Sequence, residues 1–416
     1  MKTIVLDDDP TGTQCATGVT VLLTWDVDAI VKVLKEADSV YLQTNSRALN
    51  EADAVSLTKL IKIDGDAAGL ILGEEIEYVL RGDSTLRGHV FSETQVFLNG
   101  KNSILFLPAY PDVGRTTIDG VHYVRIEGTN KRADETEFAS DPVFSFKTST
   151  MVDFVAEKTD RKGVRFSLAQ VREGAIPLSQ KFSAVSPGSV IVPDAENDSD
   201  IEIISDAVKA LRKSDAPLVV RSAAPLAASL AGVRSKGLLQ APLKSGEFAT
   251  LLVAGSHTEG ATKQLAQIAA RWGDPELINT DLAMKNPAEA AERAISGAKR
   301  KLSERNFAIV ASERTRLAEH NTLEHGGKVM DAIISTVQSL CAFADVVVAK
   351  GGITSAEVAR AGIGAKEGWV LGQILPGISV WKVKDRTGRE LMYVVVPGNV
   401  GDPDTLMKVL EIVGVH

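Results

Sequence analysis

Short apolar runs alternate with segments of helical periodicity along the whole chain. Runs rich in valine, isoleucine and leucine predict strands at 3–7, 18–24, 39–44, 103–107, 189–193, 217–221, 250–255, 307–312, 345–350, 378–383 and 391–398. Residues 26–37 and 200–214 have apolar positions at helical spacing. Strands that alternate with helices predict βαβ units and an α/β fold with a mostly parallel sheet covered by helices.

The alternating pattern is interrupted near the middle of the chain. Residues 231–248 contain glycines, lysines and a proline without a clear period, as expected for a connection between domains. A length of 416 residues fits two or three domains of ordinary size. We therefore predict two α/β domains, residues 1–235 and residues 236–416, each with its own sheet.

Composition and charge exclude several classes of protein. The net charge of -8 argues against a nucleic-acid-binding surface, which is normally basic. Cys15 and Cys341 lie far apart and form neither a disulfide framework nor a zinc motif. The N-terminus lacks the features of a signal peptide, and no apolar run approaches the length of a membrane span. We expect a cytoplasmic protein, which excludes a cell-adhesion role for Arg81-Gly82-Asp83.

Three predicted strands of the second half end in glycine-rich turns, where ligands bind in open α/β sheets. The turn at 255–263 resembles a P-loop, but Ala261 stands where the lysine is required, so it is not a Walker A site. The turn at 396–402 has two glycines before a predicted helix. Such turns can hold phosphates with backbone N–H groups, the Ser256 hydroxyl and a helix N-terminus.

The remaining turn, "KGGITSAE" at 350–357, places two glycines where the backbone could approach a ligand closely. Thr354 and Glu357 have the spacing of a capping box, which predicts the start of the next helix. One glycine turn after a strand is weak evidence for a ligand. Three in one domain favour an anionic or nucleotide ligand over plain connections.

The first half contains arginines that follow strand-like runs: Arg47, Arg81, Arg87 and Arg115. In an acidic protein they favour a pocket for a carboxylate or phosphate, which planar guanidinium groups bind with two hydrogen bonds. Surface ion pairs with neighbouring acids are the alternative. Three residues nearby offer donors and acceptors to sugar hydroxyls: Asp83, Ser84 and Thr85. A polyhydroxy acid satisfies both sets of groups.

The first predicted strand ends in three carboxylates within "LDDDPTGTQ". Asp7 and Asp9 fit the D-x-D-x-T motif of haloacid-dehalogenase-type phosphatases, in which Asp7 would attack a phosphate and Asp9 would act as acid and base. That fold also requires a lysine and a further acidic pair, and neither stands out in this sequence. A solvated strand end is the structural alternative.

Taken together and in order, these motifs resemble the four-carbon acid sugar kinase family over nearly the whole chain. Residues 8–12 are similar to the family's D-D-F-T-G, residues 83–88 match D-S-T-L-R-G, and residues 108–116 are similar to P-A-aromatic-P…G-R-T. The three glycine turns look like the family's nucleotide-binding stretches. Pro10 stands where familiar members have phenylalanine, which leaves the particular sugar acid open.

The resemblance implies an ATP-dependent kinase that acts on threonate, erythronate or a 3-oxo-tetronate. The N-terminal domain would bind the sugar acid and the C-terminal domain the nucleotide, with the active site in the cleft between them and Mg²⁺ bridging the phosphates. The resemblance implies these nucleotide-binding residues: Ser256, Gly351, Gly352, Ile353, Thr354 and Gly398. A homodimer is a further expectation at the level of the family.

Phosphoryl transfer also needs a group that orients or deprotonates the hydroxyl, and we expect Asp8 or Asp9 in that role, with Asp83 as a substitute. We expect these residues to bind the sugar acid: Arg47, Arg81, Asp83, Ser84, Thr85, Arg87, Gly88 and Arg115. Arg87 is the first candidate for the substrate carboxylate and Arg115 the second, while Gly88 would let the backbone pass close. A sensor that binds both ligands without turnover is the non-catalytic alternative.

Overall fold

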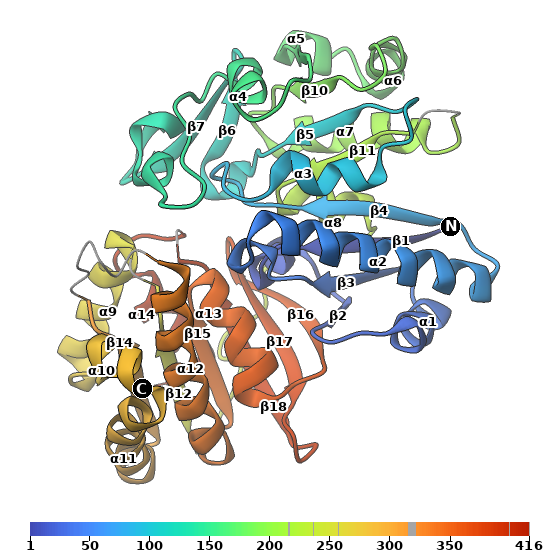
Figure 1. Ribbon diagram of the computed structural model, residues 1–416. Helices are drawn as coiled ribbons and strands as arrows, with labels where there is room; N and C mark the ends of the chain where they lie inside the picture. Colours follow the sequence, from blue (N-terminus) through green and yellow to red (C-terminus); the bar gives the residue numbers. More distant parts are fainter. Residues whose placement is uncertain (215–216, 236, 257, 315–321, 399, 416) are drawn as a thin grey trace. The chain divides into compact units, whose positions relative to one another are not determined.

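The computed structural model describes residues 1–214, 217–235, 237–256, 258–314, 322–398 and 400–415. The chain forms two compact units, whose elements are labelled in Figure 1. The N-terminal unit comprises residues 1–8 and 25–234, and the C-terminal unit comprises residues 9–24 and 235–416. The sequence analysis placed residues 9–24 in the first domain, whereas in the structure they belong to the C-terminal unit.

The N-terminal unit is built on parallel strands. In order across the sheet they are β3 (Ser39–Gln43), β1 (Lys2–Asp7), β4 (Ile76–Arg81), β11 (Val219–Ser222), β5 (Ile104–Leu107), β10 (Val190–Pro193) and β9 (Gly163–Phe166). Because β1, β4 and β11 are neighbours and parallel, their carboxyl ends lie at one edge of the sheet. Residues that follow these strands are therefore brought together.

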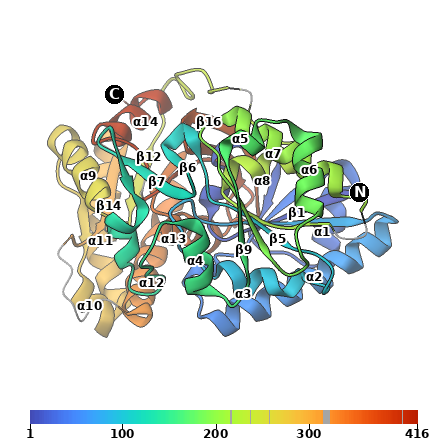
Figure 2. The ribbon, with the colours of Figure 1, turned by 90° about the horizontal axis from the view of Figure 1, so that it is seen from above.

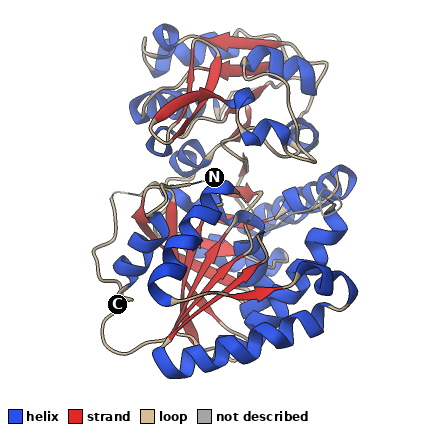
Figure 3. Ribbon diagram, turned by 90° about the vertical axis from the view of Figure 1, so that its left-hand side faces the viewer, coloured by secondary structure: helices blue, strands red, loops and turns tan. Residues whose placement is uncertain are grey.

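Helices flank these strands, as Figure 3 shows by colour. They are α1 (Val27–Glu36), α2 (Glu51–Leu72), α3 (Val90–Thr94), α4 (Met151–Lys158), α5 (Leu168–Val171), α6 (Ala175–Ser183), α7 (Asp198–Leu211) and α8 (Ala224–Leu230). Helix α6 packs against α7, which Figures 1 and 2 show from two sides. Phe91, Phe106 and Phe154 form an aromatic group within the core of this unit.

A small antiparallel sheet follows the predicted strand at 103–107. It consists of β6 (Arg115–Ile118), β7 (Val121–Ile126) and β8 (Thr129–Arg132). The sequence analysis did not predict these strands, because they are short and contain many polar and charged residues. They carry His122 and Arg115 into the same unit as the strand ends described above.

The C-terminal unit has a mixed sheet. In order it contains β13 (Glu276–Ile278), β14 (Phe307–Ser312), β12 (Thr250–Ala254), β15 (Val346–Lys350), β18 (Glu390–Val396), β17 (Ile378–Lys384), β16 (Glu367–Leu375) and β2 (Thr20–Leu22). The pairs β18–β17, β17–β16 and β16–β2 are antiparallel. Strand β2 thus adds part of the N-terminal segment to the sheet of this unit.

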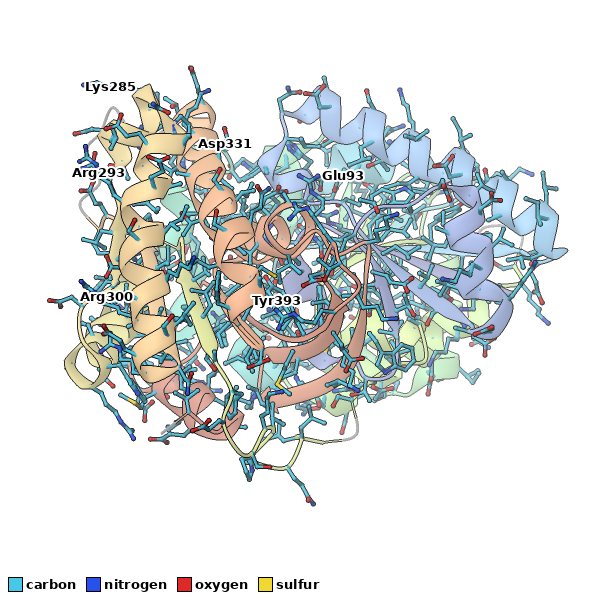
Figure 4. The ribbon with its side chains drawn as sticks, turned by 90° about the horizontal axis from the view of Figure 1, so that it is seen from below. Glu93, Lys285, Arg293, Arg300, Asp331 and Tyr393 are labelled. Carbon is cyan, nitrogen blue, oxygen red and sulfur yellow. The ribbon has the colours of Figure 1, made fainter. Side chains whose placement is uncertain are left out.

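The helices of this unit are α9 (Glu259–Trp272), α10 (Thr280–Lys285), α11 (Pro287–Arg305), α12 (Leu323–Leu340), α13 (Gly352–Glu357) and α14 (Thr405–Val413). Figure 4 places Lys285, Arg293 and Arg300 on the outer side of α10 and α11, where all three are exposed. Tyr393, labelled in the same view, is buried on β18 and donates its hydroxyl to the carbonyl of Ser355. The charged residues on the exposed side of α10 and α11 account for the helical periodicity of these two segments.

Thr13 explains why the segment after Asp8 belongs to the C-terminal unit. Residues Pro10–Cys15 form a buried 3-10 turn. The indole Nε1 of Trp381 donates to Thr13 Oγ1 at 3.0 Å, and Ser379 Oγ lies 3.0 Å from the same atom. A fully buried hydroxyl needs such partners, so this contact ties the segment to β17.

The prediction of two α/β domains is confirmed, and each strand expected from the apolar pattern is present. The predicted parallel strands are buried along most of their length and therefore read as continuous apolar runs. The parallel strands β4, β9 and β13 are partly exposed and were not predicted. In the parts of the chain that the structure describes, no helix combines the length and apolarity needed to cross a membrane.

Candidate active-site residues

The carboxyl ends of β1 and β4 in the N-terminal unit bring together acids and arginines. Arg81 Nη1 lies 3.2 Å from Asp7 Oδ1 and 3.2 Å from Asp8 Oδ1. Arg47, which follows β3, places its Nε 3.5 Å from Asp8 Oδ2. Asp7, Asp8 and Arg81 are at most 2% exposed. Opposite charges at these distances, away from water, stabilise one another and fix the ends of the strands.

Burial raises the pKa of Asp7 to about 7, although the charge of Arg81 acts in the opposite direction. Asp8 lies beside it and also raises this pKa. Within the described residues, Asp7 Oδ2 has no hydrogen-bond partner. A carboxyl group in this setting is a poor nucleophile, because it is inaccessible to a substrate and reluctant to ionise.

Arg221, on β11, is a member of this cluster that the sequence analysis missed. Its Nη1 donates to Glu93 Oε2 at 2.5 Å and its Nη2 to Asp8 Oδ2 at 3.2 Å, and the residue is 2% exposed. A Cβ atom at Gly82 would lie 2.5 Å from Arg221 Nε. The glycine between Arg81 and Asp83 therefore makes room for this guanidinium group. Arg221 could have been identified from the sequence by its position at the end of the predicted strand at 217–221.

Asp83 is the acceptor at the centre of the following loop. Arg87 Nε donates to Asp83 Oδ2 at 2.8 Å, and the Thr85 hydroxyl donates to the same oxygen. Arg47 Nη1 lies 3.7 Å from Asp83 Oδ1. Burial opposes ionisation of Asp83, but Arg87 and Arg47 together hold the pKa of its carboxyl well below its usual range. Asp83 therefore accepts protons poorly, which argues against it as the substitute base.

The backbone of the same loop has unusual dihedral angles. Leu86 is buried at φ 69°, in the left-handed region that a bulky residue seldom adopts. Gly88 has φ 119°, and a Cβ there would lie 3.2 Å from Arg221 Nη2 and 3.4 Å from Asp8 Oδ2. The backbone at Gly88 thus passes directly over the charge cluster. Strained backbone of this kind is concentrated at functional sites.

His122 and Arg115 support the loop from the small sheet. His122 Nε2 donates to the Ser84 carbonyl at 2.8 Å, and its Nδ1 accepts from Thr117 Oγ1 at 3.0 Å. Burial lowers the pKa of His122 to about 4, so the ring is neutral and has a structural role. Arg115 donates to the Val113 carbonyl, and burial lowers its pKa to about 10.

Exposure distinguishes the predicted arginines from one another. The Arg87 side chain is 18% exposed, compared with 11% for Arg47 and 3% for Arg81. Arg115 is 4% exposed. Arg87 also packs over the Phe138 ring, which fixes the orientation of its guanidinium group. Of these four arginines, Arg87 is therefore the one whose charge is most accessible to a ligand.

Asp9 lies in the C-terminal unit and has different partners from Asp8. Its Oδ1 accepts a hydrogen bond from the Thr11 backbone N–H at 2.8 Å and another from the Thr11 hydroxyl. It caps the turn at Pro10–Cys15 and is 2% exposed. The contacts of the described residues thus differ between the two neighbouring aspartates: Asp8 pairs with arginines, and Asp9 accepts from the N–H and hydroxyl of Thr11.

The three glycine turns predicted from the sequence meet at one edge of the sheet in the C-terminal unit. Ser256, Gly351 and Gly398 follow β12, β15 and β18, which are neighbouring parallel strands. A Cβ atom at Gly398 would lie 2.7 Å from Ser256 Oγ, and one at Gly351 would lie 3.1 Å from Ser256 Cβ. Only glycine allows the three turns to come this close.

The capping box expected at Thr354 and Glu357 is wrong. Helix α13 begins at Gly352, directly after β15, because Gly351 turns the chain with φ 122°. Thr354 therefore lies inside the helix, where it is buried against Gly255, while Ile353 is 41% exposed. The N-cap of α9, by contrast, is Thr258, whose Oγ1 accepts from the Ala261 N–H at 3.2 Å.

Arg314 and Lys350 are positive groups at these turns that the sequence analysis missed. Arg314 follows β14, and its Nη2 donates to Thr262 Oγ1 at 2.8 Å and to the Ser256 carbonyl. Lys350 is the last residue of β15 and is fully buried. Both lie at strand ends, where ligands bind in α/β sheets; Lys350 begins the quoted turn at 350–357 but was not singled out there, and Arg314 lies outside the glycine turns. In the described ranges, no cluster of three or more histidine, cysteine or acidic side chains could hold a metal ion.

Comparisons with known proteins match both halves of the chain. Residues 3–230 match the model of a sugar-binding N-terminal domain, and residues 251–406 match that of a nucleotide-binding C-terminal domain. The chain is also 26% identical to D-threonate kinase of Salmonella typhimurium over 343 residues, which cover 80% of this chain and 75% of that protein.

Solved structures show the same fold. A Haemophilus influenzae protein is 17% identical with a TM-score of 0.62, over 99% of this chain and 100% of that one. A Salmonella typhimurium protein described as a candidate tRNA synthase is 18% identical with a TM-score of 0.68, over 98% of each chain. The two domain models match the chain in this order, and their matched ranges include the site residues described above. The chain therefore belongs to the four-carbon acid sugar kinase family.

Proposed function

We propose that this protein transfers the γ-phosphoryl group of ATP to a hydroxyl of a four-carbon sugar acid of the threonate, erythronate or 3-oxo-tetronate type. The observation that carries the proposal is the meeting of Ser256, Gly351 and Gly398 at one sheet edge of a domain matched as nucleotide-binding. The similarity to D-threonate kinase supports the choice of substrate class.

The charge cluster of the N-terminal unit is the proposed sugar-acid site. Arg87 would bind the substrate carboxylate, because its guanidinium group is the most accessible of the predicted arginines. Arg47, Arg81 and Arg115 would fix the shape and charge of the site rather than grip the substrate. The loop residues Asp83, Ser84 and Thr85 would contact hydroxyl groups, and Gly88 would leave room for the substrate beside the backbone.

Replacing Arg87 with methionine should raise the KM for the sugar acid roughly 30- to 150-fold, because a lost hydrogen bond to a charged group costs about 2–3 kcal/mol. The KM for ATP should change little. Steady-state kinetics with each substrate varied in turn would measure both constants. Arg132→Met is the matched control, since Arg132 also pairs with an aspartate close in the sequence, Asp134, but its side chain is 37% exposed. Equal sugar-acid KM values in the two variants would remove Arg87 from the site.

Asp9 is the better of the two candidate groups for orienting or deprotonating the hydroxyl. Among the described residues, both oxygens of Asp8 accept from arginines, whereas Asp9 Oδ1 accepts from the Thr11 N–H and from a hydroxyl that can rotate away. Phosphoryl transfer relies mainly on alignment and charge neutralisation, so one such group is sufficient. Asp8 would then act by holding Arg81 and Arg221 in place.

The nucleotide would be bound by Ser256 and Gly398 at the phosphates and by Gly351, Gly352 and Thr354 at the start of α13. Ile353 is exposed and would offer an apolar contact to the base. Mg²⁺, when bound with ATP, would neutralise charge on the phosphates. It usually needs only one or two protein carboxylates beside the phosphates.

A phosphatase of the haloacid-dehalogenase type is disfavoured by the state of Asp7. Its carboxyl group is fully buried, is paired with Arg81 and has a raised pKa, whereas a nucleophile must reach its substrate in ionised form. A sensor without turnover would bind both ligands and release no ADP.

A coupled ADP-release assay tests the proposal directly. Purified protein with Mg·ATP should release ADP with one of D- or L-threonate, D- or L-erythronate or the 3-oxo-tetronates, and release little without a sugar acid. Turnover on one acid would establish the reaction and name the substrate. Thermal stabilisation by ATP with no turnover on any acid would favour the sensor, and phosphate release from a phosphorylated acid without ATP would favour the phosphatase.

A further inference from the structure

The turn after β18 has its carbonyl groups held by side chains from other elements. We call residues 397, 398 and 400–402 the C-terminal turn; Asn399 lies outside the described residues. Lys350 Nζ donates to the Pro397 carbonyl at 2.6 Å and lies 3.5 Å from that of Val400. Thr258 Oγ1 donates to the Gly398 carbonyl at 2.7 Å. These contacts come from β15 and from the N-cap of α9.

Gln264, on α9, holds the rest of the turn. Its Nε2 lies 3.3 Å from the Val400 carbonyl, 3.3 Å from that of Gly401 and 3.0 Å from that of Asp402. The side chain is 1% exposed, so these carbonyl groups face the interior of the unit. One buried amide thus sets the direction of three successive peptide groups.

The backbone N–H groups of the turn are left for another partner. Among the described residues, those of Gly398, Val400 and Gly401 donate to no other group of the protein. Gly401 has φ 92°, a left-handed conformation that changes the direction of the chain within the turn. Successive N–H groups in such a turn form a concave site for an anion, because their carbonyl groups point the other way.

The charges beside the turn independently indicate an anion. Neither Lys350 nor Arg314 has a carboxylate partner within ion-pair distance in the described part of the chain. Burial lowers the pKa of Lys350 to about 7, and the nearby charge of Arg314 lowers it further. Arg314 Nη1 is buried with no hydrogen-bond partner among the described residues. Buried cations without acidic partners are costly unless an anion compensates them.

We propose that Lys350 and Gln264 are positioning residues, which hold the C-terminal turn so that its N–H groups, together with Arg314, bind the phosphate chain of a nucleotide. This inference rests on the proposed function and adds to it the residues that shape the phosphate site. The C-terminal turn would then bind the phosphate groups of a nucleotide whichever base the nucleotide carries. Lys350 and Gln264 act through the turn and need not touch the nucleotide.

Replacing Gln264 with leucine keeps the size of the side chain and removes its donor. The Kd for Mg·ADP, measured by calorimetry, should rise about 10-fold or more, because the lost hydrogen bonds leave the turn free to rotate its carbonyl groups outward. The KM for the sugar acid should stay close to wild type, because the proposed sugar-acid site is built from residues of the N-terminal unit. Lys350→Met should act in the same way, and Lys350→Arg should restore part of the affinity.

Gln338→Leu is the matched control, because Gln338 also donates its amide to a backbone carbonyl, that of Ala361, but away from the turn. Its Kd for Mg·ADP should equal that of wild type. If Gln264→Leu and Lys350→Met also bind Mg·ADP as wild type does, the inference is wrong while the proposed function stands. If wild-type protein itself binds no Mg·ADP, the proposed function fails.

Hydrogen exchange on the wild-type protein tests the same point without any substitution. Mg·ADP should protect the peptide that contains Gly398, Val400 and Gly401, and adenosine, which lacks phosphates, should not. Protection by Mg·ADP of the turns at Ser256 and Gly351 without protection of this peptide would overturn the inference even if the variants fail to fold.

Discussion

Replacing Asp9 with asparagine is expected to lower kcat by roughly 100- to 10,000-fold, the usual contribution of a positioned acid–base group. The KM values for ATP and the sugar acid should change little, because the substitution removes only the proton acceptor. Asparagine is as good an N-cap as aspartate, so the turn at Pro10–Cys15 should keep its structure. Steady-state kinetics and a thermal unfolding curve for the variant would check both expectations.

Asp26→Asn is the control for this substitution. Asp26 is also an aspartate that caps a helix, accepting from the Ala29 N–H at 2.8 Å, but it lies at the start of α1 and is exposed. Its kinetic constants should match those of wild type. A variant Asp9→Asn with normal kcat, together with a large loss in Asp8→Asn, would transfer the role to Asp8.

Replacing Arg221 with methionine should destabilise the protein by about 3–5 kcal/mol, the cost of removing one partner from a buried ion pair. Arg221 neutralises two buried carboxylates, Asp8 and Glu93, and both would lose a charged donor. Gly82 would also face a space that the guanidinium group now fills. Urea unfolding of the variant and of wild type would measure the loss.

Lys181→Met is the matched surface control, because Lys181 pairs with Glu173 in an ion pair whose side chains are 35% and 46% exposed. It should change the free energy of unfolding by no more than about 1 kcal/mol. A similarly small effect of Arg221→Met would mean that the cluster at Asp8 does not depend on this residue. Arg81 and Arg47 would then suffice to hold Asp8.

The placement of the three glycine turns could be predicted from the sequence. Each followed an apolar run long enough to be read as a buried strand, and the carboxyl ends of parallel strands share an edge. The substrate loop at 83–88 was found in the same way, from polar and charged residues after a strand. These predictions depend only on which residue types follow an apolar run within a short segment of the sequence.

The partners of the charged residues could not be predicted in this way. Arg221 and Glu93 are separated by 128 positions and Arg221 and Asp8 by 213, and no local pattern links them. Gln264 looked like an ordinary polar residue of an amphipathic helix, yet it holds the C-terminal turn. The capping box at Thr354 failed because a glycine started the helix earlier than the side-chain pattern suggested.

The sequence by itself determined the α/β class, the most apolar strands and the places where ligand-binding turns occur, because these follow from apolar periodicity and from glycine. Only the tertiary structure decided which arginine stays accessible, which aspartate pairs with the arginines and to which compact unit residues 9–24 belong. The reason is physical: exposure and ion pairing are set by strand order, and strand order depends on contacts between residues far apart in the chain.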